Sequence, residues 1–338
     1  MPTDISYKSV SDPSYHKIQP PGQTRSYPEP TKEGTIPFEY SKTGLKGETW
    51  YQLWGDLSSN KTPLICLHGG PGIPPNYLLP ISLIHTDHDI PVLMYHQIGC
   101  GKSTHFKDKR GDTDFWAIDM FMAELDNVKA ALGIKEFDLL GHSWGGMLAA
   151  NYAIDKQPKG LRKLIISNSP SNMKVWVQTA NRLRKELPQD VQVTLDRCER
   201  EGKTDTEEYE EAVTVFYNRH ACRLEPWPKE ILDSFGYLKE DSTVYETMNG
   251  PSEFYVVGSL KTWSITEELT RITAKTAPGG LLVVNGYFDE AQDETCAPYF
   301  YQPSCRTKWV RYALSSHMPE LEETEAYVRD LGMFLTSE

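Results

Sequence analysis

Short apolar segments recur along the chain and are separated by longer, more polar stretches. The segment Glu48–Trp54 alternates weakly between apolar and polar residues, as a half-exposed strand does. Pro63–Leu67 is a short apolar run, and Ile90–Tyr95 and Phe137–Leu140 are candidates for buried strands. Three further segments complete the predicted set of strands: Leu161–Ile166, Gly280–Asn285 and Trp309–Leu314. Strands that are apolar on both faces predict a mostly parallel sheet with helices on both sides, and therefore an α/β fold.

The stretch Phe115–Leu132 has the periodicity of an amphipathic helix. Its apolar residues are spaced alternately three and four positions apart, which places them in one stripe: Ile118, Phe121, Leu125, Val128 and Leu132. Gly133 follows as a C-terminal stop. A further helical run, Met147–Ile154, follows the predicted strand that ends at Leu140. Strands and helices therefore alternate, as the α/β class requires.

This alternation of strands and helices is interrupted once. From about Asn168 to Lys261 the chain consists of polar, charged, helix-like stretches that carry aromatic side chains. We interpret this region as a helical cap inserted into the α/β core. The predicted organisation is an N-terminal arm (1–33), a first part of the core (34–167), the cap (168–262) and a second part of the core (263–338).

The composition argues against several classes of partner. A net charge of −12, with no compensating basic stripe, disfavours binding to nucleic acid or to anionic lipid. No apolar stretch approaches membrane-spanning length, and Met1–Gln23 lacks the basic and then apolar pattern of a secretory signal. The six cysteines are scattered, which favours free thiols and a cytoplasmic location. We expect a small-molecule or short-peptide substrate; the sequence makes no prediction of the oligomeric state.

A serine in a Gly-x-Ser-x-Gly motif is the first candidate for chemistry. The motif, Gly141–Gly145, lies between the predicted strand Phe137–Leu140 and the helical run Met147–Ile154. A serine at such a sharp turn is held in a strained backbone conformation, and neighbouring glycines avoid collisions there. The positive end of the following helix favours developing negative charge. Ser143 is therefore predicted to be a nucleophile.

A serine hydroxyl needs a base that takes its proton and a third group that orients the base. Asp289 follows the predicted strand Gly280–Asn285, and His317 follows the strand that ends at Leu314. Both lie at carboxyl ends of predicted strands, where open α/β sheets place their sites. The order serine, acid, histidine is that of α/β-hydrolases. We predict a catalytic triad of Ser143, Asp289 and His317.

A glycine-rich turn, His68–Gly72, follows another predicted strand. Glycines allow a backbone N–H group to approach an oxyanion closely, which favours Gly70 N–H as one donor to a tetrahedral intermediate. Trp144 N–H, next to the nucleophile, is the other predicted donor. Gly69 is expected to contact the substrate.

These motifs together resemble the prolyl aminopeptidase (proline iminopeptidase) family of α/β-hydrolases, especially the branch with the tricorn-interacting aminopeptidase and the L-amino-acid amidases. The resemblance extends from about Gly34 to the C-terminus. The segments that carry it are His68–Gly72, Gln97–Ser103, Gly141–Gly146, Met248–Phe254, Gly286–Glu290 and Ser316–Pro319.

The resemblance implies a helical cap above the site and acidic side chains that bind the free α-amino group of the substrate. Carried over by motif, the candidates for this role are Glu253 and Glu290. Paired carboxylates offset the desolvation of an ammonium group and would restrict cleavage to the first residue of a substrate. One departure is that His96 precedes Gln97 where the family usually has Asp, which we place near the pocket entrance.

Two further motifs are weak. Gly99–Thr104 imitates the end of a phosphate-binding loop, but the first required glycine is replaced by His96. His85–Asp89 contains residues able to bind metal, but we expect them in a solvated loop ahead of a strand. We therefore expect neither a metal nor an organic cofactor.

The leading hypothesis is acyl transfer through a serine-bound intermediate, by an aminopeptidase or amino-acid amidase. Two alternatives stay open. One is a hydrolase or acyl-transfer enzyme acting on an ester, lactone or amide of a specialised metabolite. The other is a hydrolase-like binding protein without turnover, although a binder has no need of a complete triad.

Overall fold

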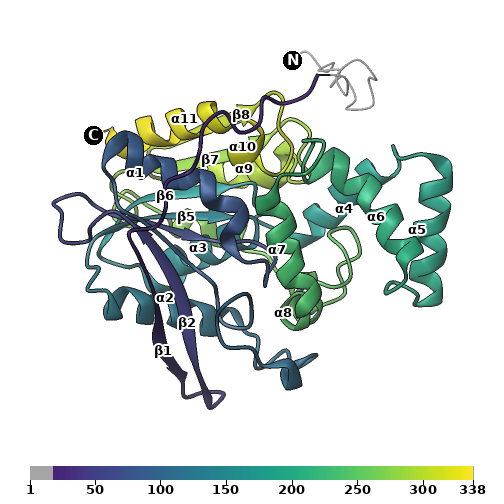
Figure 1. The fold of residues 1–338 in the computed structure, drawn as a ribbon, viewed down its shortest axis with the longest axis horizontal. Coiled ribbons are helices and arrows are strands. Elements are labelled where there is room, and N and C mark those ends of the chain that lie inside the picture. Colours follow the sequence, from purple (N-terminus) through teal and green to yellow (C-terminus); the bar gives the residue numbers. More distant parts are fainter. Residues whose placement is uncertain (1–17, 338) are drawn as a thin grey trace.

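The computed structural model describes residues 18–337, so the first 17 residues of the predicted arm lie outside the described residues (Figure 1). Its centre is an eight-stranded sheet with the order β1-β2-β4-β3-β5-β6-β7-β8. The strands are β1 (Lys32–Tyr40), β2 (Leu45–Trp54), β3 (Leu64–Leu67), β4 (Val92–Tyr95), β5 (Phe137–His142), β6 (Leu161–Ser167), β7 (Leu281–Gly286) and β8 (Thr307–Tyr312). The pairs β1–β2 and β2–β4 are antiparallel, and all other pairs are parallel. The predicted α/β class is confirmed.

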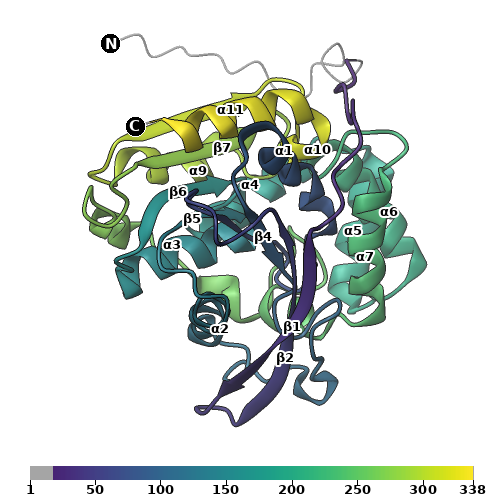
Figure 2. The ribbon, with the colours of Figure 1, turned by 60° about the vertical axis from the view of Figure 1, so that its left-hand side comes forward.

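Alternate residues of the central strands enter two separate cores. In β3, Ile65 and Leu67 belong to one core, and Leu64 and Cys66 belong to the other. The first core is closed by α2 (Ile118–Ala131), α3 (Trp144–Lys156) and α9 (Asp293–Tyr301). The second is closed by the 3-10 helix η2 (Pro75–Ser82) with α1 (Leu83–His88), α10 (Pro319–Glu322) and α11 (Thr324–Thr336). Figure 2 shows α11 and α1 on one side of the sheet, with α3 and α2 on the other.

A group of helices follows β6 and precedes β7 in the sequence, and it projects to one side of the sheet (Figure 1). It contains α4 (Met173–Arg184), α5 (Gln189–Glu201), α6 (Glu207–His220), α7 (Lys229–Glu240) and α8 (Thr243–Met248). This region has an apolar core of its own, in which Leu183, Leu195 and Phe216 are buried. Short 3-10 helices complete the described elements: η3 (Lys107–Lys109), η4 (Ser259–Thr262) and η5 (Glu267–Arg271).

Two local expectations differ from the structure. Strand β1 was not delimited by the apolar pattern, because this edge strand is largely exposed and contains Pro37. The expectation of a loop over His85–Asp89 is wrong: Leu83 and Ile84 bury the start of α1, which ends at His88. Within residues 18–337, no helix is long and apolar enough to cross a membrane.

Candidate active site

Ser143 lies at the junction between β5 and α3. Its φ of 55° and ψ of −122° are a conformation that non-glycine residues rarely adopt. A Cβ atom on Gly141 would lie 2.1 Å from Gly145 O, and a Cβ atom on Gly145 would lie 2.1 Å from Leu67 O. The glycines of the motif are therefore required by the close approach of backbone segments around the strained serine.

Asp289 is buried in the turn after β7, and its carboxylate accepts four hydrogen bonds. Oδ1 lies 2.7 Å from His317 Nδ1 and accepts a bond from Ala291 N–H at 2.7 Å. Oδ2 accepts bonds from the Asn168 side-chain amide at 2.6 Å and from Gly286 N–H at 3.3 Å. All lone-pair directions of the carboxylate are thus occupied, so its orientation toward His317 is fixed.

His317 lies in the loop after β8 and against the serine turn. His142, the residue before Ser143, donates from Nε2 to the His317 carbonyl oxygen at 2.7 Å, and the two rings are 4.8 Å apart. His142 Nδ1 accepts from the Tyr77 hydroxyl, which in turn accepts from Gly69 N–H at 2.7 Å. Burial lowers the pKa of His142 well below its usual value, so this ring is neutral. The network therefore joins the glycine-rich turn at Gly69, the turn that carries Ser143 and the loop that carries His317.

The structure brings Ser143, Asp289 and His317 to one region, although the Ser143 hydroxyl makes no hydrogen bond to any described residue. His317 Nε2 instead has Glu290 Oε1 at 3.8 Å. In hydrolases without substrate, the bond between nucleophile and base is often formed only when the substrate binds.

The predicted oxyanion donors lie on either side of Ser143. Gly70 and Trp144 line the same pocket as Ser143, and neither backbone N–H donates to a described residue. Gly70 has a φ of +105°, and a Cβ atom there would lie 2.7 Å from the amide nitrogens of Gly72 and Ile73. Gly69 packs directly on the serine, since a Cβ atom at this position would be 3.1 Å from Ser143 Cβ.

Gln97 connects the two segments that carry these donors. Its Nε2 donates to His68 O at 3.2 Å, and its Oε1 accepts from the Trp144 indole N–H at 2.9 Å. His68 Nε2 accepts from Gln97 N–H at 3.0 Å, and burial lowers the pKa of His68 to about 4. The imidazole is thus a neutral acceptor that fixes the Gln97 loop against the glycine-rich turn.

Glu253 and Glu290 form an acidic pair beside His317, in which Glu290 is buried and Glu253 is half-buried. Glu253 Oε1 accepts from the Tyr245 hydroxyl at 2.7 Å, and its backbone oxygen accepts from the Trp176 indole at 2.8 Å. Glu290 is 2% exposed, and its Oε2 has no hydrogen-bond partner among the described residues. Burial, together with the carboxyls of Glu253 and Asp289, raises the pKa of Glu290 well above its usual value. Burial also raises the pKa of Glu253.

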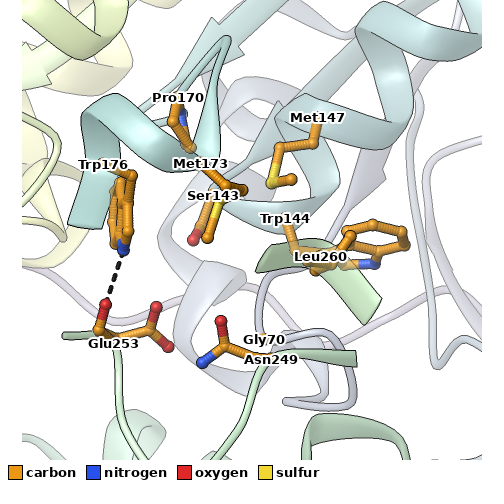
Figure 3. A pocket seen from close by; sticks show the side chains of 10 residues that line it. All are labelled: Gly70, Ser143, Trp144, Met147, Pro170, Met173, Trp176, Asn249, Glu253 and Leu260. Atoms are coloured by element: carbon orange, nitrogen blue, oxygen red, sulfur yellow. Dashed lines mark hydrogen bonds between the residues drawn. The ribbon is translucent and has the colours of Figure 1, made fainter. Parts of the chain in front are cut away.

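The pocket at Ser143 combines an apolar wall with Glu253 of the acidic pair, whereas Glu290 and His317 are not among its lining residues. Figure 3 shows the Ser143 hydroxyl directed toward the side where Glu253 and Asn249 lie. The apolar lining consists of Met147, Pro170, Met173, Trp176 and Leu260. The pocket is small, with room for about one water molecule.

His96 is not among the residues that line this pocket, and its predicted place near the entrance stays a prediction. The ring is buried, and Nδ1 accepts from Lys102 N–H at 3.0 Å within the turn that Gly101 makes possible. Trp50 packs edge-on against it at 4.5 Å. A neutral imidazole here accepts a backbone hydrogen bond, a structural role within the Gln97–Ser103 segment.

Three polar residues near the site were missed by reasoning from the sequence. Asn168 contacts Asp289, Gln97 contacts the Trp144 indole, and Tyr245 in the cap donates to Glu253. No sequence motif with a chemical signature marks any of these contacts. Asn168 was detectable only as a polar residue directly after a strand, a position where open sheets gather their sites. Among residues 18–337, no group of three or more acidic, histidine or cysteine side chains is arranged to hold a metal ion.

Comparisons with known proteins agree with this geometry. Residues 62–318 match the family model for the alpha/beta hydrolase fold. The chain is 40% identical over 283 residues to a proline iminopeptidase of Heyndrickxia coagulans, covering 83% of this chain and 93% of that protein. The crystal structure of VinJ is similar with a TM-score of 0.84 and 41% identity, covering 90% of this chain and 98% of that one. The proline iminopeptidase of Mycobacterium smegmatis is similar with a TM-score of 0.79 and 38% identity, covering 90% and 97%.

Proposed function

Because the chain belongs to the α/β-hydrolase family and, within it, to the proline iminopeptidases, we propose that it releases a residue with a free amine, proline or another small apolar residue, from the N-terminus of a short peptide or amide. The chain is a serine hydrolase. The proposal assigns nucleophile, acid and base to Ser143, Asp289 and His317. We place the enzyme in the cytoplasm, which is supported by the six unpaired cysteines.

The acidic pair is the observation that carries the choice of substrate. Glu290 is buried and Glu253 is half-buried next to His317, and neither forms an ion pair with a described lysine or arginine. Two neighbouring carboxyls removed from water without a cation are costly, and a bound ammonium group supplies the missing positive charge. A substrate whose amine is held there would present its first carbonyl to Ser143. The apolar wall of Pro170, Met173 and Trp176 suits a small apolar side chain.

The reaction that we propose follows from these positions. His317 Nε2 takes the proton of the Ser143 hydroxyl as Oγ forms a bond to the substrate carbonyl carbon. The carbonyl oxygen becomes an oxyanion that accepts from the N–H groups of Gly70 and Trp144. The C–N bond then breaks, and His317 gives its proton to the leaving amine. Water, deprotonated by His317, releases the acyl group from Ser143 in the second half of the reaction.

A matched set of substrates tests the proposal. We expect hydrolysis of prolyl or alanyl arylamides, and a loss of kcat/KM of at least about 10²-fold when the same compounds are N-acetylated, because the ammonium contact is removed. Aryl esters without an amine serve as the comparison set. Equal kcat/KM for the free and acetylated amines would contradict an aminopeptidase and favour an amine-independent ester, lactone or amide hydrolase.

A further inference from the structure

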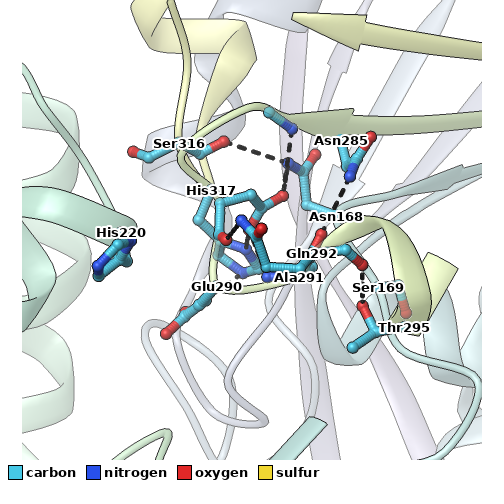
Figure 4. A network of polar contacts seen from close by, with 12 residues as sticks. Asn168, Ser169, His220, Asn285, Glu290, Ala291, Gln292, Thr295, Ser316 and His317 are labelled. Carbon is cyan, nitrogen blue, oxygen red and sulfur yellow. Dashed lines mark hydrogen bonds and ion pairs between the residues drawn. The ribbon is translucent and has the colours of Figure 1, made fainter. Parts of the chain in front are cut away.

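Asn168 has an unusual backbone position directly after β6. Its φ is 54°, in the left-handed region, and its side chain is fully buried. Asparagine tolerates this region better than other non-glycine residues do, and buried residues held there cluster at functional sites. In this conformation the side chain donates to Asp289. Figure 4 shows it directed toward the loop that carries Ser316 and His317.

We propose that Asn168 is a positioning residue for the triad, which holds the Asp289 carboxylate in the plane that His317 needs. This inference rests on the proposed function of Asp289 and His317. The Asn168 amide donates to Asp289 Oδ2 at 2.6 Å, opposite the oxygen that faces His317 Nδ1. This bond opposes rotation of the Asp289 carboxylate and so keeps Oδ1 facing His317 Nδ1.

The direction of the Asn168 amide is itself fixed. Ser167 Oγ donates to Asn168 Oδ1 at 2.6 Å, so the oxygen end of the amide is occupied and the NH₂ end faces Asp289. The Tyr327 hydroxyl donates to Ser167 Oγ at 3.2 Å. Ser167 also supplies the carbonyl oxygen that accepts from Ser143 N–H at 2.9 Å. One short segment therefore supports both the nucleophile and the acid.

The site offers a matched pair of substitutions. Asn168→Asp keeps the size of the side chain but replaces the donor by a second carboxyl beside Asp289. Asn285→Asp does the same one strand away: Asn285 is equally buried, and its amide donates to Asp293 Oδ1 at 2.9 Å and to Ala291 O at 3.2 Å, with no hydrogen bond to Asp289. Both variants place two carboxyls together, but only the first does so at the triad.

The expected difference is a dependence on pH. Two adjacent carboxyls share one proton at low pH, and this proton restores the bond to Asp289 Oδ2. As pH rises the proton is lost, two negative charges repel, and the acid loses its orientation. The other titratable groups that face this pair are His317, Glu290, Glu320, Cys296 and Tyr327. They are the same in the wild-type protein, so the ratio of variant to wild-type rate isolates the new pair.

The experiment measures kcat and KM from pH 5 to 10, normalised to active sites titrated with a fluorophosphonate. We expect the kcat ratio of Asn168→Asp to wild type to fall at least about tenfold as pH rises, with KM within about twofold. The ratio for Asn285→Asp should stay flat. A flat ratio for Asn168→Asp would overturn the proposal.

A second variant keeps the proposal testable if Asn168→Asp does not fold. Asn168→Gly accepts the positive φ without strain and removes the donor. We expect a roughly 10- to 100-fold lower kcat per titrated site, and a shift or broadening of the low-field proton resonance of His317 Nδ1–H. Wild-type kcat with an unchanged resonance would contradict the positioning role. Failure of the triad assignment is distinguishable, because Ser143→Ala would then keep the fluorophosphonate reactivity of the wild-type protein.

Discussion

Asp289 and Glu290 are adjacent in the chain and almost equally buried, yet their surroundings are opposite. Every lone-pair direction of Asp289 is occupied by a donor from the protein, whereas Glu290 Oε2 has no partner among the described residues. The hydrogen bonds of Asp289 fix its carboxylate toward His317. The unpartnered oxygen of Glu290, beside the Glu253 carboxyl, is where we propose that the substrate ammonium binds.

The largest effect on activity should come from a change at Asp289, whose hydrogen bonds are complete. Asp289→Asn keeps the shape of the side chain but removes the acceptor for His317 Nδ1–H and turns an NH₂ group toward a donor. We expect kcat to fall by about 10⁴-fold, with little change in KM, because the base is held in the wrong tautomer. Steady-state kinetics on titrated enzyme measure this. A fall of less than tenfold would remove Asp289 from the triad.

A change at Glu290, whose Oε2 has no hydrogen-bond partner within residues 18–337, should affect activity in a way that depends on the substrate. Glu290→Gln keeps the volume and removes one charge from the acidic pair. We expect kcat/KM for an aminoacyl arylamide to fall by about 10²-fold, as expected when one partner of a buried charge pair is removed. Hydrolysis of an aryl ester without an amine should change by less than about threefold. Equal losses on both substrates would mean that Glu290 supports the triad instead of binding the amine.

The smallest effect concerns stability. The folded-state pKa of Glu290 is raised, so its contribution to stability is present below the unfolded pKa, about 4.3, and is lost as pH rises through the raised value. Glu290→Gln should therefore melt near the wild-type temperature at pH 4 and a few degrees higher at pH 8. Scanning calorimetry at both pH values measures the difference. The exposed Glu207→Gln serves as the control, and a Glu290→Gln variant that is less stable at pH 8 would contradict an unpaired buried carboxyl.

The difference between these two carboxyls also shows what the sequence could predict. The α/β class, most strands and the membership of the family are confirmed, because buried strands and the turns with glycine at Gly70, Gly141 and Gly145 have strong local signatures. The roles of Ser143 and its partners stay predictions, although the structure brings them together.

Other features depend on contacts between distant segments and leave no local pattern. Strand β1 was missed because an edge strand with few buried residues lacks an apolar run. Asn168 and Gln97 were missed because each is one polar residue whose importance lies in what it touches, Asp289 in one case and the Trp144 indole in the other. The placement of His96 near the entrance stays a prediction, because a motif position does not say whether a side chain faces a pocket or its own turn.

Peptide mapping after reaction with a fluorophosphonate tests whether His317 makes the Ser143 hydroxyl nucleophilic. We expect one phosphonylated peptide, carrying the label on Ser143, which is absent in Ser143→Ala and forms about 10⁴-fold more slowly in His317→Ala. A label on another residue, or wild-type labelling rates in either variant, would contradict it.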